Sequence, residues 1–140
     1  MAELSDYLEP KLLDHIYNEV TYTPPTTIYV ALYTSDPTDA DTGTEVSGGS
    51  YARMLVNENG GGAPEWALAV IDGIGFKVTN SDDITFPTAT AAWGVVTHVG
   101  LRDANTGGNL LHHTALEASQ DVGDGGIVKF LAGSLTMRLE

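Results

Sequence analysis

The sequence predicts a mainly β protein, an antiparallel β-sandwich of the jelly-roll or Ig-like type with an N-terminal α-helix. Three observations support this fold class. Apolar residues alternate with a period of two in several short runs, turn-forming residues separate these runs, and one helical stripe lies near the start of the chain. With 140 residues, of which 42% are hydrophobic and 18% charged, the chain suits one domain, 1–140.

Segment 1–20 is predicted to form the N-terminal helix, because apolar residues recur there every three or four positions. The stripe consists of Leu4, Leu8, Leu12 and Ile16, widened by Leu13, Tyr17 and Val20. Because Pro10 would disturb a helix interior, the helix either kinks there or begins there with Pro10 in its first turn, and we expect the most regular helix over about 10–19. Ser5 and Asp6 are the candidate capping residues.

After two prolines at 24–25 the pattern becomes that of short strands, and we expect the sandwich to extend over 26–140. The predicted strands are 26–34, 51–56, 76–80, 83–86, 93–101, 109–116, 126–132 and 134–140. Strand 26–34 is apolar on both faces, so we expect both of its faces to be covered. Alternation in strand 93–101 places five residues on one face, namely Trp93, Val95, Thr97, Val99 and Leu101.

The segments between these strands are rich in Gly, Asp, Asn and Thr, which favour turns. We expect the segments 35–50, 102–108 and 120–126 to reverse the direction of the chain. Segment 57–75 is the least regular, and we expect an irregular excursion there with a short element at 66–71.

Three histidines, His98, His112 and His113, fall on predicted strands and are the first candidates for chemistry. Neighbouring residues on a strand point to opposite faces, so His112 and His113 cannot easily bind one metal ion. We therefore expect these three histidines to be polar residues on the outer faces of strands or at interfaces. One alternative stays open, that His98 and His112 meet across neighbouring strands and respond to mild acid. An enzyme would need these two histidines and an acidic residue in one cleft.

An acidic loop is the second candidate. Its calcium candidates are Asp36, Asp39, Asp41 and Glu45, which lie close to Gly43. Their spacing does not match the D-x-[DN]-x-[DN]-G-x₅-E pattern that wraps oxygens around one calcium ion. Because Asp and Thr also form turns without any ion, we expect no metal site here, with calcium as the alternative.

The remaining composition excludes several classes of protein. There is no cysteine, no G-x-S-x-G motif and no phosphate-binding loop, so we expect neither an enzyme nor a cofactor. The net charge of −13 opposes binding to nucleic acids and to anionic membranes. No apolar run has the length of a membrane span, and the first twenty residues lack the order of a signal peptide.

Four segments follow one another in a familiar order: LSDYLEPKLLDHIYN, PPTTIYVALYTSDPTDADTGTEVSGGSYAR, ITFPTATAAWGVVTHVGLRDANTGGNLL and GSLTMRLE. The order resembles a family of small tailed-bacteriophage virion proteins known as tail fibre or head decoration (head fibre) proteins. EVSGGSYAR at 45–53 and WGVVTHVGLRDANTGGNLL at 93–111 are the most specific parts, and 57–75 fits less well. The resemblance implies a non-enzymatic virion component and leaves its position, head or tail, open.

Size favours one of these positions. A fibre usually needs heptads, repeats or a long β-prism, and the sequence carries none of them. We therefore expect a capsid decoration or cement protein, assembled in the host cytoplasm, that binds the major capsid protein as a symmetric dimer or trimer. The alternatives are a tail or tail-fibre component bound to tail proteins, and a receptor- or glycan-binding module.

The predicted helix is the candidate contact element of such a protein. Its interface candidates are Leu8, Leu12, Ile16 and Tyr17. A helix attached to a sandwich can pack on a neighbouring protein or on its own sheet. The sequence supports both arrangements equally, the second being a helix that closes one end of the core.

Overall fold

A computed structural model of the chain describes residues 3–58 and 65–139. Its helix is α1 (Leu8–Tyr17). The strands of the first layer are β1 (Glu3–Leu4), β2 (Thr27–Tyr33), β3 (Met54–Glu58), β7 (Gly94–Arg102) and β8 (Leu110–Val122). The strands of the second layer are β4 (Val70–Asp72), β5 (Gly75–Thr79), β6 (Ile84–Thr85), β9 (Lys129–Phe130) and β10 (Thr136–Leu139).

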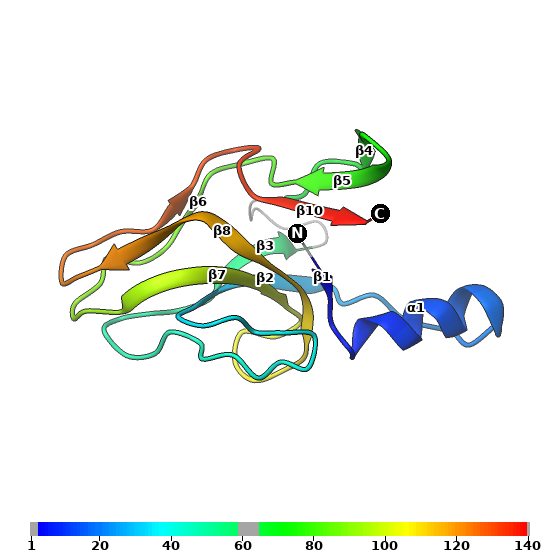
Figure 1. Cartoon of the computed structure of the whole chain (residues 1–140), viewed down its shortest axis with the longest axis horizontal. Helices are drawn as coiled ribbons and strands as arrows, with labels where there is room; N and C mark the ends of the chain where they lie inside the picture. Colours follow the sequence, from blue (N-terminus) through cyan, green and yellow to red (C-terminus); the bar gives the residue numbers. More distant parts are fainter. Residues whose placement is uncertain (1–2, 59–64, 140) are drawn as a thin grey trace.

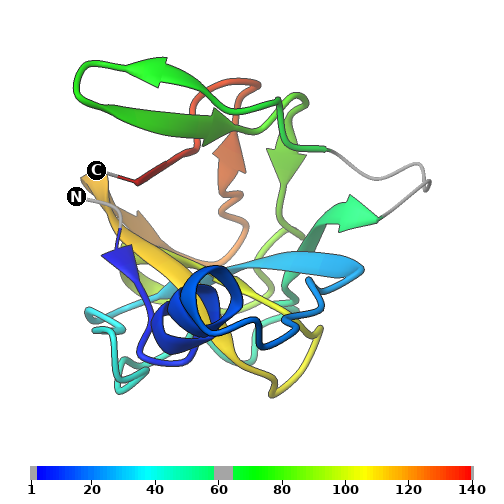
Figure 2. The ribbon, with the colours of Figure 1, turned by 90° about the vertical axis from the view of Figure 1, so that its right-hand side faces the viewer.

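Two layers of antiparallel strands face each other, which confirms the predicted β-sandwich with an N-terminal helix (Figures 1 and 2). The first layer is a five-stranded sheet in the order β1-β8-β7-β2-β3. The second layer combines a three-stranded sheet, β10-β5-β4, with the pair β6-β9. We call the side of the five-stranded sheet that is turned away from the second layer its outer face.

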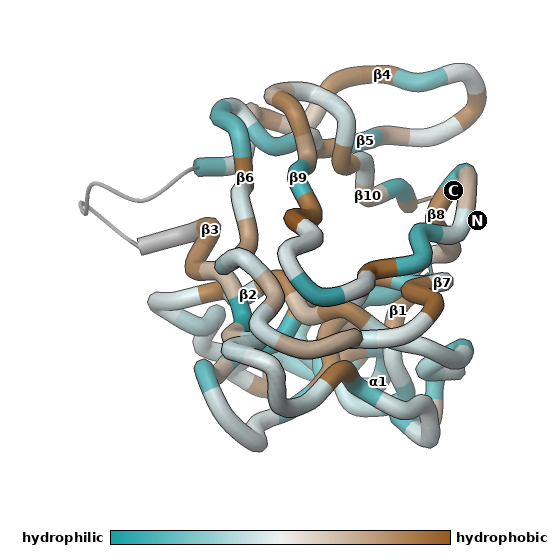
Figure 3. Tube along the Cα trace, turned by 90° about the vertical axis from the view of Figure 1, so that its left-hand side faces the viewer, coloured by the Kyte–Doolittle hydropathy of each residue, from teal (hydrophilic) through white to brown (hydrophobic). Residues whose placement is uncertain are grey.

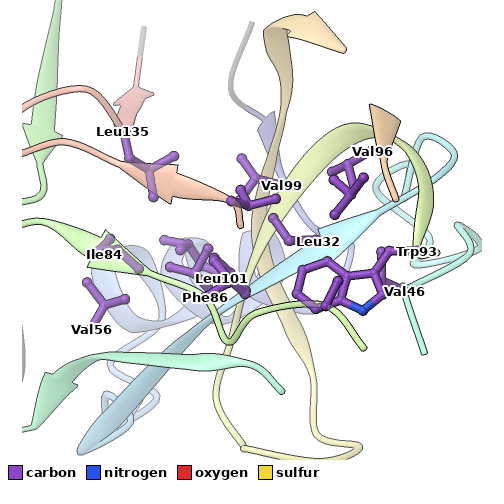
Figure 4. Packing of buried hydrophobic residues seen from close by; sticks show 14 of the residues in the cluster. Leu32, Val46, Val56, Ile84, Phe86, Trp93, Val96, Val99, Leu101 and Leu135 are labelled. Carbon is purple, nitrogen blue, oxygen red and sulfur yellow. The ribbon is translucent and has the colours of Figure 1, made fainter. Parts of the chain in front are cut away.

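The main hydrophobic core lies between the two layers, as Figure 4 shows. The five-stranded sheet contributes Val30, Leu32, Val56, Val96, Val99 and Leu101, and the second layer contributes Ile84, Phe86, Leu135 and Met137. A smaller cluster of Ala31, Tyr33 and Leu110 covers part of the outer face. Strand β2 is therefore buried on both faces, as its sequence predicts, and residues 30–33 expose 0% of their surface.

Helix α1 extends away from the sandwich, and none of its residues is buried (Figure 1). It begins two residues before the predicted segment and contains Pro10 in its first turn, as expected. Its N-cap position is Tyr7, which forms no side-chain cap. Ser5 still satisfies the first free amides, because its carbonyl accepts hydrogen bonds from the amides of Leu8 and Glu9 at 2.9 and 3.1 Å.

The predicted alternation along 93–101 is wrong in the middle of β7. Trp93, Val99 and Leu101 are buried as expected, but Val95 is 46% exposed and Val96 is completely buried. The alternation breaks where the register against β8 shifts, because Val96 pairs with Gln120 and His98 pairs with Ala115. One residue of β7 thus lies opposite four residues of β8, and an odd shift of register moves the neighbouring side chains to the other face.

Other differences concern segment boundaries. Strand β8 continues to Val122 through the start of the predicted turn 120–126, because residues 94–96 of β7 pair with residues 120–122. Part of the excursion 57–75 forms β4 and an isolated bridge from Trp66 to Asn80, while its residues 59–64 lie outside the described part. The two-residue strand β1 was not predicted at all.

Candidate functional site

Residues 34–45, here called the acidic loop, follow β2 and fold back beside it. The loop is closed by hydrogen bonds from the amide of Thr34 to the carbonyl of Thr44 and from Val46 to Leu32, both 2.9 Å long. At Gly43, an added Cβ would lie 2.5 Å from the Cα of Pro37, which is itself buried. The loop is therefore tightly packed against itself, and its acidic side chains have defined positions.

Two of the four calcium candidates are held by arginines. The carboxylate of Asp41 accepts a short hydrogen bond from the guanidinium of Arg102, whose Nε also donates to the hydroxyl of Tyr33 at 2.7 Å. Glu45 accepts two hydrogen bonds of 2.7 Å from Arg53, one on each carboxylate oxygen. The Glu45 pair is bidentate, the Asp41 pair is a single charge-assisted hydrogen bond, and both are of the strong class, so these two acids are already engaged.

The Glu45–Arg53 pair ties the acidic loop to the turn after β7. The side chain of Arg53 is only 7% exposed, and its Nη1 donates to the carbonyls of Ala104 and Gly107 at 2.7 and 2.8 Å. Burial alone would raise the pKa of Glu45, but the hydrogen bonds and charge of Arg53 outweigh it and lower that pKa below its usual value. The carboxylate therefore stays ionised in mildly acidic solution.

The other two calcium candidates face histidines on the outer face of the sheet. Asp39 Oδ1 lies 3.0 Å from Nε2 of His113. Asp36 Oδ1 lies 3.7 Å from Nδ1 of His113 and 3.8 Å from Nε2 of His98. Asp36 and Asp39 thus both lie beside His113, whereas Asp41 and Glu45 meet Arg102 and Arg53, so the four acids do not converge on one point.

His112 points the other way, into the sandwich. It is 6% exposed, and its Nε2 has no hydrogen-bond partner among the described residues. Burial, and secondarily the neighbouring His113, lower its pKa from 6.5 to about 4. The alternative that His98 and His112 meet is therefore wrong: His113 pairs with Gly100, two residues from His98, and so shares the outer face with it.

One further cluster of potential metal ligands emerges, and the sequence pattern did not reveal it. Ligand atoms of Glu3, Asp39 and His113 all lie within 4.8 Å of one another. Glu3 belongs to β1 and pairs with His113 across the sheet. Asp39 and His113 are 74 positions apart, and the two-residue strand that brings Glu3 to them has no detectable period, so only the folded chain shows this group.

The family model of Gp80, described as podophage GP4 fiber I protein gp80, matches residues 3–138. The chain belongs to this family of phage fibre proteins. It is accordingly a structural component of the phage virion, which confirms the broad class that the sequence resemblance implied. No curated protein is similar enough to be matched with it.

The interface candidates of this fibre protein divide into two groups along α1. Leu8 and Leu12 are partly buried, and Leu8 packs against the main core. Ile16 and Tyr17 are 66% and 76% exposed, on the part of the helix that projects from the sandwich. The first turn of α1 therefore closes one end of the core, while its last turns present an apolar surface.

A second exposed apolar surface lies on the β4–β5 hairpin, where Figure 3 shows hydrophobic residues at the periphery. Ile71, Phe76 and Leu139 pair across β4, β5 and β10, so their side chains share one face. They are 74%, 55% and 54% exposed. The next pair on that face, Val78 and Met137, packs into the core, so the apolar surface of the core continues outward onto the hairpin.

A groove lies between β8 and the strands β9 and β10. It has a volume of about 640 Å³ and a mixed lining that includes Leu116, Phe130, Glu117, Lys129 and Arg138. The outer-face histidines are on the opposite side of the sheet. Within residues 3–58 and 65–139, the structure has no helix that is both long and apolar enough to cross a membrane.

Proposed function

We propose that the chain is a non-enzymatic subunit of a phage fibre that attaches to the body of the virion through the projecting turns of α1. The observation that carries this proposal is the apolar surface of a helix that leaves its own domain. Four large apolar residues of this region, Leu13, Ile16, Tyr17 and Val20, are 54–76% exposed. Exposed apolar patches of this kind commonly mark contact sites for other proteins, because burial removes the apolar surface from water.

The size of this surface indicates how it would act. Burial of one large apolar side chain contributes about 1.5–3 kcal/mol, and association costs several kcal/mol of lost rotational and translational freedom. One helix per subunit would therefore bind weakly. Several helices carried by one homo-oligomer, a dimer or a trimer, would bind much more tightly because the later contacts become intramolecular.

We assign the contact between copies to the β4–β5 hairpin. Its exposed face continues the apolar surface of the core, and a symmetric dimer can place two identical faces of this kind against each other. Ile71, Phe76 and Leu139 would then be covered by the same residues of a second copy. The hairpin and α1 are separate surfaces, so one subunit can use both at once.

The absence of catalysis is part of the proposal, and three features support it. His98 and His112 lie on opposite faces of the sheet, so they share no cleft with an acid. The hydroxyl of Thr97 contacts Nδ1 of His98 at 2.8 Å, but Asp36 is 3.8 Å from the other ring nitrogen, beyond hydrogen-bond distance. Arg102 and Arg53 engage two further acids of the loop, Asp41 and Glu45.

A head decoration protein is the second candidate. The compactness of the sandwich favours it, because a short globular subunit suits a cap on a regular lattice better than a long shaft. In that case the helices would contact the major capsid protein instead of tail proteins. A receptor-binding module assisted by calcium has less support, because two of its four proposed ligands, Asp41 and Glu45, are engaged by arginines.

The copy number of the protein in purified virions separates the two candidates. Mass spectrometry against the major capsid protein would give a few copies up to some tens for a fibre at the tail. A count on the order of hundreds, matching the symmetry of the capsid lattice, would establish decoration of the head and overturn the fibre proposal. We expect neither nucleic acid nor membrane as a partner, because the net charge is −13.

A further inference from the structure

We propose that Glu3, Asp39 and His113 form a binding site for one divalent transition-metal ion of the Zn²⁺ type. The three side chains come from β1, the acidic loop and β8, and their ligand atoms lie within 4.8 Å of one another. Ligands held about 2.0–2.2 Å from a zinc ion lie about 3.0–3.6 Å apart. Asp39 and His113 already match this spacing at 3.0 Å. Glu3 is exposed and closes the remaining gap by a change of rotamer.

The surroundings of His113 support the same assignment. Its side chain is 5% exposed, so the imidazole is held in one orientation by the sheet and the loop. The carboxylate of Asp36 lies 3.7 Å from Nδ1 of the same ring, beyond hydrogen-bond distance but close enough to add negative charge beside it. Three carboxylates around one histidine also make the site strongly negative, which a divalent cation would neutralise.

The donor set selects the class of ion. Calcium and magnesium prefer sites built only from oxygen atoms, whereas one imidazole with two carboxylates suits zinc and its first-row neighbours. The metal would use three protein ligands and keep a position for water. This site differs from the calcium candidates of the acidic loop, of which it includes only Asp39.

The place of the site suggests what the ion would do. Residues 3–20, here called the arm, contain β1 and α1, and only two residue pairs join β1 to β8. Around Asp39 the arm touches the loop directly, because the amide of Asp6 donates to the carbonyl of Asp39 at 2.9 Å. A metal ion shared by Glu3, Asp39 and His113 would fix the base of the arm. It would thereby fix the direction in which α1 projects, wherever on the virion the protein resides.

The test is metal binding by the purified full chain after treatment with EDTA. We expect one Zn²⁺ per chain by titration calorimetry, and a rise in Tm of about 5–10 °C at roughly a hundredfold excess of Zn²⁺ over Kd. Calcium at the same concentration should leave Tm unchanged. Co²⁺ in place of Zn²⁺ should give visible absorption bands that depend on the same residues.

Two variants and one control decide the outcome. Glu3→Gln removes an exposed ligand and keeps the Asp39–His113 contact, so it should fold normally and lose at least tenfold in Zn²⁺ affinity. His113→Gln should abolish binding, and Glu9→Gln, which removes the same charge from the exposed side of α1, should bind as the wild type does. The proposal is overturned if the wild type does not bind Zn²⁺ or if Glu3→Gln loses less than tenfold in Zn²⁺ affinity. If His113→Gln does not fold, the affinity of Glu3→Gln alone tests the proposal.

Discussion

His112 is a buried titratable group whose protonation destabilises the folded chain. Its pKa falls from 6.5 to about 4 on folding because burial disfavours the imidazolium. The unfolded chain therefore binds more protons than the folded chain between these two pH values, and the free energy of unfolding decreases as the pH is lowered through this window. At pH 7 both states carry a neutral ring, so the contribution of this group vanishes there.

This residue supplies the first prediction. Lowering the pH from 7 to 4 should cost the wild type about 3 kcal/mol through His112. His112→Gln cannot titrate, so it should lose less stability over the same range, although it starts from a lower value. Urea unfolding of both proteins at the two pH values measures the difference. Equal losses in the two proteins would mean that the ring is not buried as the structure has it.

The residues of the acidic loop show what the sequence can and cannot predict about a site. The composition singles out Asp36, Asp39, Asp41 and Glu45 as a group. Their partners are not readable in the same way, because Asp41 meets Arg102 across 61 positions and Asp39 meets His113 across 74. Such contacts depend on strand register, which no local pattern specifies. The group was therefore predictable, and its pairing with the sheet was not.

At the scale of elements, local periodicity predicts most strands and fails where the register changes. The pattern of apolar residues correctly predicts strand β2 and the buried positions of Val99 and Leu101 in β7. The register shift between Val96 and His98 leaves no mark in the composition, so the predicted face of Val95 is wrong. Strand β1 contains two residues, fewer than any periodic pattern requires.

The register shift between β7 and β8 leads to the second prediction, which concerns two neighbouring valines. Val96→Thr should cost about 1–3 kcal/mol, because it places a hydroxyl in the main core. Val95→Thr should change stability by less than about 0.5 kcal/mol, because Val95 is 46% exposed. Thermal unfolding of both variants tests the register, since a regular alternation without the register shift predicts the reverse order of the two losses in stability.

The third prediction concerns helix α1, whose two halves should behave differently. Ile16→Glu should leave Tm close to that of the wild type, because this side chain is 66% exposed, but it should greatly reduce incorporation into virions. Leu8→Ala should lower stability by about 1–3 kcal/mol, because Leu8 packs partly buried against the core. Complementation of a phage that lacks the gene, with quantification in purified particles, measures incorporation.

A matched variant completes this comparison. Glu9→Gln alters the exposed surface of the same helix without touching its apolar side, so it should enter virions normally. Normal incorporation of Ile16→Glu would show that the projecting turns of α1 are not the attachment surface. The proposal for the helix would then fail, whatever the position of the protein in the particle.

At the scale of the whole molecule, charge and apolar surface act in opposite directions on association. The chain carries 19 acidic and 6 basic residues, so two copies repel each other at long range. The exposed face of the β4–β5 hairpin attracts a second copy only at contact. The range of the repulsion depends on salt, with a Debye length of about 30 Å at 10 mM and about 8 Å at 150 mM ionic strength.

This balance gives the last prediction. Sedimentation velocity should show more dimer or trimer at about 150 mM salt than at about 10 mM, because salt screens the repulsion and leaves apolar burial intact. Ile71→Glu should be monomeric at both salt concentrations, whereas Ile16→Glu should associate as the wild type does, because only the first change lies on the hairpin. An oligomer that dissociates as salt rises would be held by ion pairs and would contradict the assigned interface. A wild type that stays monomeric under all these conditions would contradict the assigned interface, and each subunit would then bind the virion through one α1 only. Because one helix binds weakly, such a monomer would need additional contacts with the virion.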